Sequence, residues 1–290
     1  MRDLVDAALM LPDWWKRIDG SRAWQNGVFD GLCVAYGLVA LSALVQIVRI
    51  QVRASQYGWT TQKAFQTLNL VVCGSRSAVF GFRRQVGALK SDFARDLLLG
   101  LPALGFLSTY GLLVLFWAEI YYQTRSTLVG NLHPLFLGLN AAVYLVQIAV
   151  WAWADASGAR DAGLQISGCF VACVSAAVGW CFVLYGSRLF LMLRRFPIES
   201  GSRRSKLREV GVVAVACASS LFLRAAALVW WAFEGPDAGL DVLAHPLLNL
   251  GYYALTEVVP ASVVLYVLRK LPPRRTPQGY APIPAQYPYT

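Results

Sequence analysis

Apolar residues in this 290-residue chain gather into long continuous stretches, without the alternation of a half-buried strand. A helix needs about 20 predominantly apolar residues to cross a bilayer. Seven stretches reach that length: 28–50, 61–82, 97–121, 132–154, 164–193, 210–233 and 246–268. Backbone groups have no water to bind in the bilayer core, so spanning segments are expected to be helical. The pattern predicts an all-α membrane protein, a receptor-like bundle of seven transmembrane helices.

Composition agrees with this interpretation. The chain is 57% apolar and 14% charged, whereas soluble domains are about 45–50% apolar and about 25% charged. The second stretch is the least apolar, because it contains Lys63, Asn69 and Arg76. We expect an amino-terminal tail over 1–27, a seven-helix domain over 28–270 and a tail rich in Pro and Tyr over 271–290. These short remainders leave no room for a separate soluble catalytic domain.

The distribution of basic residues predicts the orientation. With seven spans, thirteen Lys and Arg fall on the side of the carboxyl terminus and nine on the side of the amino terminus. Lys and Arg are enriched in cytoplasmic loops. The count predicts a cytosolic carboxyl terminus and a luminal amino terminus.

Five ionisable residues lie inside the predicted spans. They are Arg76, Glu119, Arg188, Arg224 and Glu257. Such residues are costly in hydrocarbon and are expected to face the bundle interior or to reach the interface. A rise of 1.5 Å per residue places Arg76, Arg224 and Glu257 at depths that allow Glu257 to pair with either arginine. Glu119 and Arg188 lie together near the cytosolic ends of their helices, which allows a second pair. The set is either a ligand pocket or ion path, or a polar clamp that fixes helix register.

The predicted fifth loop carries the densest basic cluster of the chain. Its members are Arg194, Arg195, Arg203, Arg204, Lys206 and Arg208. We interpret the cluster as a topology signal that also attracts anionic lipid, or as a docking site for a protein or an RNA. The last four follow Ser200, Gly201 and Ser202, and we expect that stretch to be flexible.

Enzyme chemistry finds little support in the sequence. The two histidines, His133 and His245, each precede a proline at the start of a predicted span, and we interpret them as residues that begin helices. All six cysteines lie in apolar stretches, where packing is the simpler role. We predict no catalytic site, no cofactor and no metal site, and no sequence-specific contact with nucleic acid.

Several stretches resemble the plant tobamovirus multiplication protein family. They are YGWTTQK at 57–63, LFWAEIY at 115–121, RLF at 188–190, MLRRFPIES at 192–200, and a segment from LDVL at 240–243 through His245-Pro246 to LPP at 271–273. The likeness extends from about Phe29 to Arg275.

The resemblance implies a multi-pass protein of the tonoplast, the vacuolar membrane. It implies a host factor that tethers tobamovirus replication proteins to membranes and supports viral RNA replication. The implied partners are the viral helicase-domain replication protein, a tetraspanin-like host membrane protein and a small GTPase. Two alternatives remain from the residues themselves. One is a receptor-like sensor, favoured by the interior charges, and the other is a small-solute transporter built from three-helix repeats.

Overall fold

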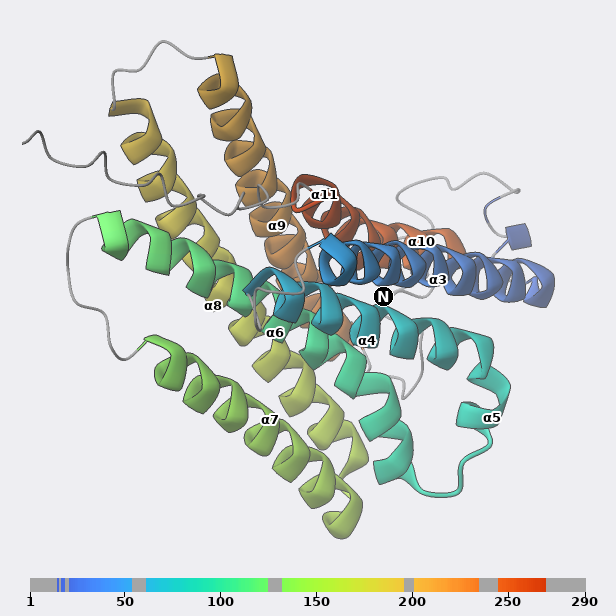
Figure 1. The fold of residues 1–290 in the computed structure, drawn as a ribbon. Coiled ribbons are helices and arrows are strands. Elements are labelled where there is room, and N and C mark those ends of the chain that lie inside the picture. Colours follow the sequence, from blue (N-terminus) through green and yellow to red (C-terminus); the bar gives the residue numbers. More distant parts are fainter. Residues whose placement is uncertain are drawn as a thin grey trace, which may run out of the picture.

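The structure is a computed structural model that describes residues 15, 17–18, 21–53, 61–124, 132–195, 201–234 and 245–269 (Figure 1). Every regular element in these ranges is helical. The elements are α3 (Arg22–Arg53), α4 (Thr61–Gly81), α5 (Arg83–Gly87), α6 (Asp92–Thr124), α7 (Leu132–Ser157), α8 (Arg160–Arg195), α9 (Gly201–Glu234), α10 (Pro246–Tyr253), the π-helical turn η1 (Ala254–Val258) and α11 (Val259–Val267). The all-α prediction is confirmed for the described part of the chain.

Six of these helices are long and apolar enough to cross a membrane: α3, α6, α7, α8, α9 and the continuous helix formed by α10, η1 and α11. The protein is therefore a multi-pass membrane protein. The remaining predicted stretch, 61–82, forms α4, which has 21 residues but is not among these six.

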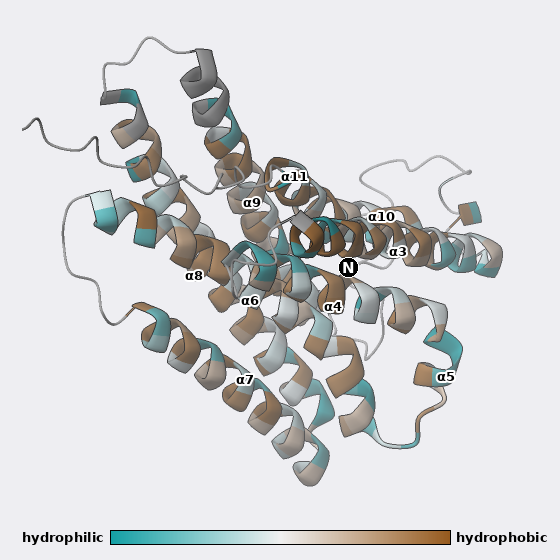
Figure 2. Ribbon diagram, in the orientation of Figure 1, coloured by the Kyte–Doolittle hydropathy of each residue, from teal (hydrophilic) through white to brown (hydrophobic). Residues whose placement is uncertain are grey.

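The helices pack mainly in sequential pairs, with α3 against α4 and α8 against α9. Helix α6 contacts α4, α7 and α8, and the last helix closes the bundle against α3 and α9. Helix α7 lies at the edge (Figure 1) and exposes apolar side chains such as Leu137 and Leu145. Hydrophobic residues recur along the whole length of the long helices (Figure 2), and many of them are exposed. Such exposed apolar surface is what a helix in contact with lipid requires.

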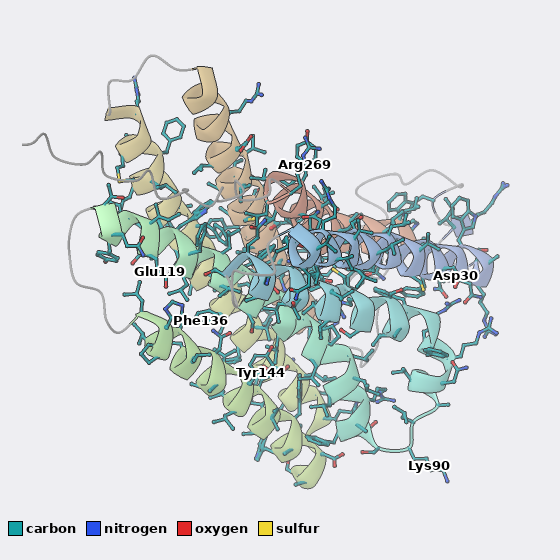
Figure 3. All side chains as sticks on the ribbon, viewed as in Figure 1. Asp30, Lys90, Glu119, Phe136, Tyr144 and Arg269 are labelled. Carbon is teal, nitrogen blue, oxygen red and sulfur yellow. The ribbon has the colours of Figure 1, made fainter. Side chains whose placement is uncertain are left out.

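The two ends of the bundle are marked by different pairs of ionisable side chains. At one end, which we call the Asp30 end, Arg83 pairs with Asp30 at 2.6 Å and Arg160 pairs with Asp92 at 2.8 Å. At the other, which we call the Glu119 end, His133 Nδ1 lies 2.9 Å from Glu119 Oε1. The starts of α3, α6 and α8 share the Asp30 end, and α9 begins at the Glu119 end. Figure 3 shows Asp30 and Lys90 away from Glu119 and Arg269.

The predicted flexibility after Ser200 is wrong from Gly201 onward. Helix α8 ends at Arg195, and α9 begins at Gly201, so only 196–200 lie between them, outside the described residues. Helix α9 thus extends well before the predicted apolar stretch, and α8 and α9 project together beyond their neighbours (Figure 1). The reason is that 201–208 contain several Arg, Lys and Leu residues, which are good helix formers. Arg203, Arg204, Lys206 and Arg208 therefore lie on helical backbone.

Candidate functional site: a buried cluster of charges

Glu257 is held at an irregular turn of the last helix. Pro260 has no N–H to donate, and its ring crowds the carbonyl four residues earlier. The helix takes the π-helical turn η1 just before this proline, and the Thr256 hydroxyl donates to the carbonyl oxygen of Tyr252 at 2.7 Å. π-turns occur often at functional sites. Here the turn contains Glu257, which is fully buried.

Arg76 reaches Glu257 from α4 with two parallel hydrogen bonds. Its Nε donates to Glu257 Oε2 at 3.0 Å and its Nη2 to Oε1 at 2.8 Å. A third bond runs from Nη1 to the carbonyl oxygen of Leu99 at 3.2 Å. The guanidinium also lies 5.2 Å from the ring centroid of Tyr253. This fork-like pairing is the strong form of an arginine–carboxylate contact.

Arg224 binds the same carboxylate from α9. Its Nη1 donates to Glu257 Oε1 at 3.0 Å, and its Nη2 donates to the carbonyl oxygen of Ala103 at 3.5 Å. From α3, the Tyr36 hydroxyl donates to Glu257 Oε2 at 2.5 Å. One carboxylate thus joins α3, α4, α9 and η1. The structure brings Arg76, Arg224 and Glu257 together, where the sequence allowed either arginine as the partner.

This cluster carries a net charge of +1, from two guanidinium groups and one carboxylate. Arg76 is 4% exposed, Arg224 2% and Glu257 0%. Among the described residues, Glu257 is the only buried carboxylate. A buried charge is costly unless it is paired and hydrogen-bonded. The arrangement can therefore fix helix register, and it leaves positive charge unbalanced in the core.

Glu119 and Arg188 do not form the predicted second pair. Glu119 contacts His133 at the start of α7, and Figure 3 shows where Glu119 lies in the bundle. Arg188 instead lies over the rings of Tyr121 and Tyr185, at 5.6 and 5.8 Å from their centroids. The rotation of α8 turns Arg188 toward these aromatic rings instead of toward Glu119. His133, which the sequence predicts only to begin a helix, also contacts Glu119.

The histidine at the other end has the predicted role. The His245 ring accepts a hydrogen bond from the N–H of Leu247 at 3.2 Å and caps the start of α10. Its ring also stacks on Trp15 at 3.7 Å. The described residues contain no group of three or more His, Cys, Asp or Glu side chains able to hold a metal ion.

A second polar network lies nearer the Glu119 end and was not predicted. Gln66 Nε2 donates to Gln46 Oε1 at 2.8 Å, and Gln46 Nε2 donates to the carbonyl oxygen of Leu265 at 3.2 Å. Gln62 Nε2 donates to the carbonyl oxygen of Leu268 at 2.6 Å. These bonds tie α3 and α4 to α11. Polar residues at helical spacing in α4 were the available signal for it.

Two adjoining cavities open at the Glu119 end. One, of about 390 Å³, includes Phe116, Trp117, Ile120 and Leu189 in its wall. The other, of about 280 Å³, includes Thr61, Gln62 and Phe116. Glu209 of α9 and Leu268 border both. Residues from three stretches that carry the family resemblance, 57–63, 115–121 and 188–190, therefore converge here.

The chain matches the THH1/TOM1/TOM3 domain over residues 10–284. The chain belongs to the THH1/TOM1/TOM3 family. It is 47% identical to tobamovirus multiplication protein 1 of Nicotiana tabacum, over 96% of each chain. Tobamovirus multiplication protein 3 of N. tabacum is 49% identical to it, over 93% of this chain and 91% of that protein. Tobamovirus multiplication protein 1 of Arabidopsis thaliana is 46% identical, over 97% of this chain and 100% of that protein. No solved structure matches this THH1/TOM1/TOM3 chain significantly.

Proposed function

We propose that this protein is a host factor for tobamovirus multiplication that anchors viral replication proteins to the tonoplast and supports viral RNA replication. The observation that carries the proposal is the nearly full-length match to proteins named for tobamovirus multiplication. The architecture agrees with an anchoring role, because the described chain consists almost entirely of long apolar helices. A partner on one side of the membrane can contact only their ends and the connections between them.

Helix α4 is proposed as the seventh span. Its 21 residues extend roughly 30 Å at 1.5 Å per residue, which matches the bilayer core. Its polar residues Gln66, Asn69 and Arg76 are buried, so they do not face lipid. The polar residues that lower the hydropathy of α4 therefore face the interior of the bundle and not the bilayer.

The Glu119 end is proposed as the cytosolic face, with the carboxyl terminus on that side and the amino terminus in the lumen. Its basic residues outnumber those of the Asp30 end, and Lys and Arg favour the cytosol. The extended ends of α8 and α9 carry six of them, and Figure 1 shows these ends projecting beyond the other helices. Cations at this surface would attract anionic lipid or an acidic partner.

The replication protein is proposed to dock at this face, on the projecting α8 and α9 ends and the adjoining cavities. The cavities are apolar apart from Glu209, Thr61 and Gln62, so they suit an apolar side chain of a docked segment. The helicase domain of the viral protein is the proposed ligand. A tetraspanin-like membrane protein and a small GTPase are further proposed partners.

Affinity capture tests this function. The tagged protein is captured from membranes of infected and uninfected plants, and a tagged, unrelated tonoplast protein is the control. We expect viral replication protein to co-purify with this chain and not with the control. Equal recovery on both, or on neither, would contradict the anchoring role.

A receptor-like sensor is the second candidate, and the buried cluster of Arg76, Arg224 and Glu257 favours it. Unbalanced charge in the core of a helical bundle is costly, and such residues in membrane proteins commonly serve function. A sensor would change its helix packing when a ligand binds, and would do so without viral protein. Protease sensitivity of the purified chain, measured with and without candidate solutes, separates this role from passive anchoring.

A further inference from the structure

Arg224 uses only part of its hydrogen-bonding capacity. Its two Nη groups bind Glu257 and the carbonyl oxygen of Ala103. Its Nε–H is buried and has no partner among the described residues. An unmet buried donor costs about 1–3 kcal/mol, and more when the group is charged. Something besides the described side chains is needed to satisfy it.

Two buried tyrosines lie in the surroundings of Arg224. The hydroxyl of Tyr110, on α6, is buried without a partner in the described part of the chain, and Arg224, Glu257 and Cys217 are within electrostatic range of it. Tyr252, on α10, is also within electrostatic range of Arg224. Tyr110 and Tyr252 are 1% and 5% exposed. Three buried hydrogen-bond donors thus come from three helices, α6, α9 and α10.

The charge of this region selects the kind of ligand. Arg76 and Arg224 carry two positive charges against the single negative charge of Glu257. Asp92 and Asp96, also on α6, pair instead with Arg160 at the Asp30 end. A water molecule satisfies donors but leaves the excess charge, and it needs acceptors for its own hydrogens. An anion accepts all three hydrogen bonds and neutralises the cluster.

We propose that Arg224 Nε–H and the hydroxyls of Tyr110 and Tyr252 bind one small monovalent inorganic anion, of the chloride class, inside the bundle. The low exposure of all three side chains excludes a bulky organic anion. The bound ion brings the charge of the cluster to zero. The site lies between α6, α9 and α10, away from the docking surface at the Glu119 end.

The test measures thermal unfolding of detergent-purified protein while chloride replaces gluconate at constant sodium. A ligand bound only by the folded state raises the melting temperature as its concentration rises. We expect a saturable increase with chloride. Tyr110→Phe and Tyr252→Phe each remove one hydrogen bond to a charged ligand, so each is expected to weaken the apparent chloride affinity by about tenfold.

Tyr144→Phe is the matched control, because Tyr144 of α7 accepts a hydrogen bond from Ser108 and lies outside the cluster. It is expected to keep the wild-type chloride dependence. Equilibrium dialysis of the wild-type protein against radioactive chloride gives a second readout, and stoichiometric binding that bromide displaces and gluconate does not is expected. A wild-type melting temperature independent of chloride, no retained chloride, or unchanged chloride dependence in both phenylalanine variants would overturn the proposal.

Discussion

Glu257 binds more side chains than any other ionisable residue of the cluster. Its carboxylate accepts hydrogen bonds from Arg76, Arg224 and Tyr36. Each partner belongs to a different helix. If the carboxylate is removed, both guanidinium groups stay positively charged, since arginine is not deprotonated in proteins. The consequences of a substitution at Glu257 are therefore electrostatic first and steric second.

Glu257→Leu is expected to destabilise the bundle strongly. Removing one partner of a buried ion pair typically costs about 3–5 kcal/mol, and this substitution leaves two arginines without a carboxylate. Tyr36→Phe is the graded control, since it removes one hydrogen bond and no charge, at about 1.5–3 kcal/mol. Thermal unfolding in detergent measures both. A Glu257→Leu protein that melts like the wild type would show that the cluster does not hold the helices together.

Gly111 allows the close approach of α6 and α7. A Cβ built at this position lies 3.0 Å from Cε2 of Phe136, whereas one at Gly138, on α7, has no atom within 4 Å. Gly111→Leu is expected to force the helices apart and to cost about 1–3 kcal/mol, as overpacking usually does. Gly138→Leu makes the same chemical change in open space. Equal melting temperatures of the two variants would show that the Phe136 side chain can move aside, and that Gly111 is not needed for the packing of α6 against α7.

At the scale of the elements, α9 behaves differently from the loop that the sequence predicted. Its first turns carry Arg203, Arg204, Lys206 and Arg208 on helical backbone. Successive residues of a helix point in different directions, and neighbours on one face are three or four positions apart. In the sequence, Arg203 and Lys206 are three positions apart and Arg204 and Arg208 are four positions apart.

Replacing these four cations by Gln is expected to lower recruitment of viral replication protein by up to several hundred-fold, because each of the four charges near an anionic surface contributes about 1 kcal/mol. Gln is also a good helix former, so α9 should persist. The matched control replaces four cations of the amino-terminal side, Arg17, Arg22, Arg84 and Lys90, which are exposed. Co-purification from infected membranes is the measurement. Undiminished capture at normal expression and localisation would leave the cluster as a topology signal alone.

At the scale of the whole molecule, the number of spans determines which ends share a side. If α4 spans, the amino terminus and Lys90 lie on one side and the carboxyl terminus on the other. If α4 does not span, the amino terminus and Lys90 lie on opposite sides. The ion pair of Arg83 with Asp30 and the stacking of His245 on Trp15 place these segments at one end of the bundle.

We expect an amino-terminal tag and a Lys90→Cys side chain to be protected inside intact vacuoles, and a carboxyl-terminal tag to be accessible. Protease digestion reads the tags, and a membrane-impermeant maleimide reads the cysteine. Unmodified protein is the background control, because its six cysteines lie within helices. Labelling of Lys90→Cys together with a protected amino-terminal tag would show that α4 does not cross. An accessible amino-terminal tag with a protected carboxyl-terminal tag would reverse the orientation.

The sequence by itself determined the class of the protein and the positions of its long helices, although not the extension of α9 back to Gly201. Long apolar stretches fix where helices form in a membrane, because the backbone must bond to itself there. The rise per residue also fixes depth, so the sequence alone predicts that Glu257 lies at the level of Arg76 and Arg224. His245 precedes a proline at the start of an apolar stretch, and it caps α10 as this position predicts.

Only the tertiary structure decided which groups at one depth meet, because rotation about each helix axis is set by packing with other helices. It assigned both arginines to Glu257, turned Arg188 toward Tyr121 and Tyr185, and gave Glu119 to His133. It placed Tyr36 on the carboxylate, although nothing distinguishes this tyrosine in an apolar stretch. It also produced the π-turn before Pro260, since a proline permits several local geometries and the packing of the last helix against α3 and α9 selects one.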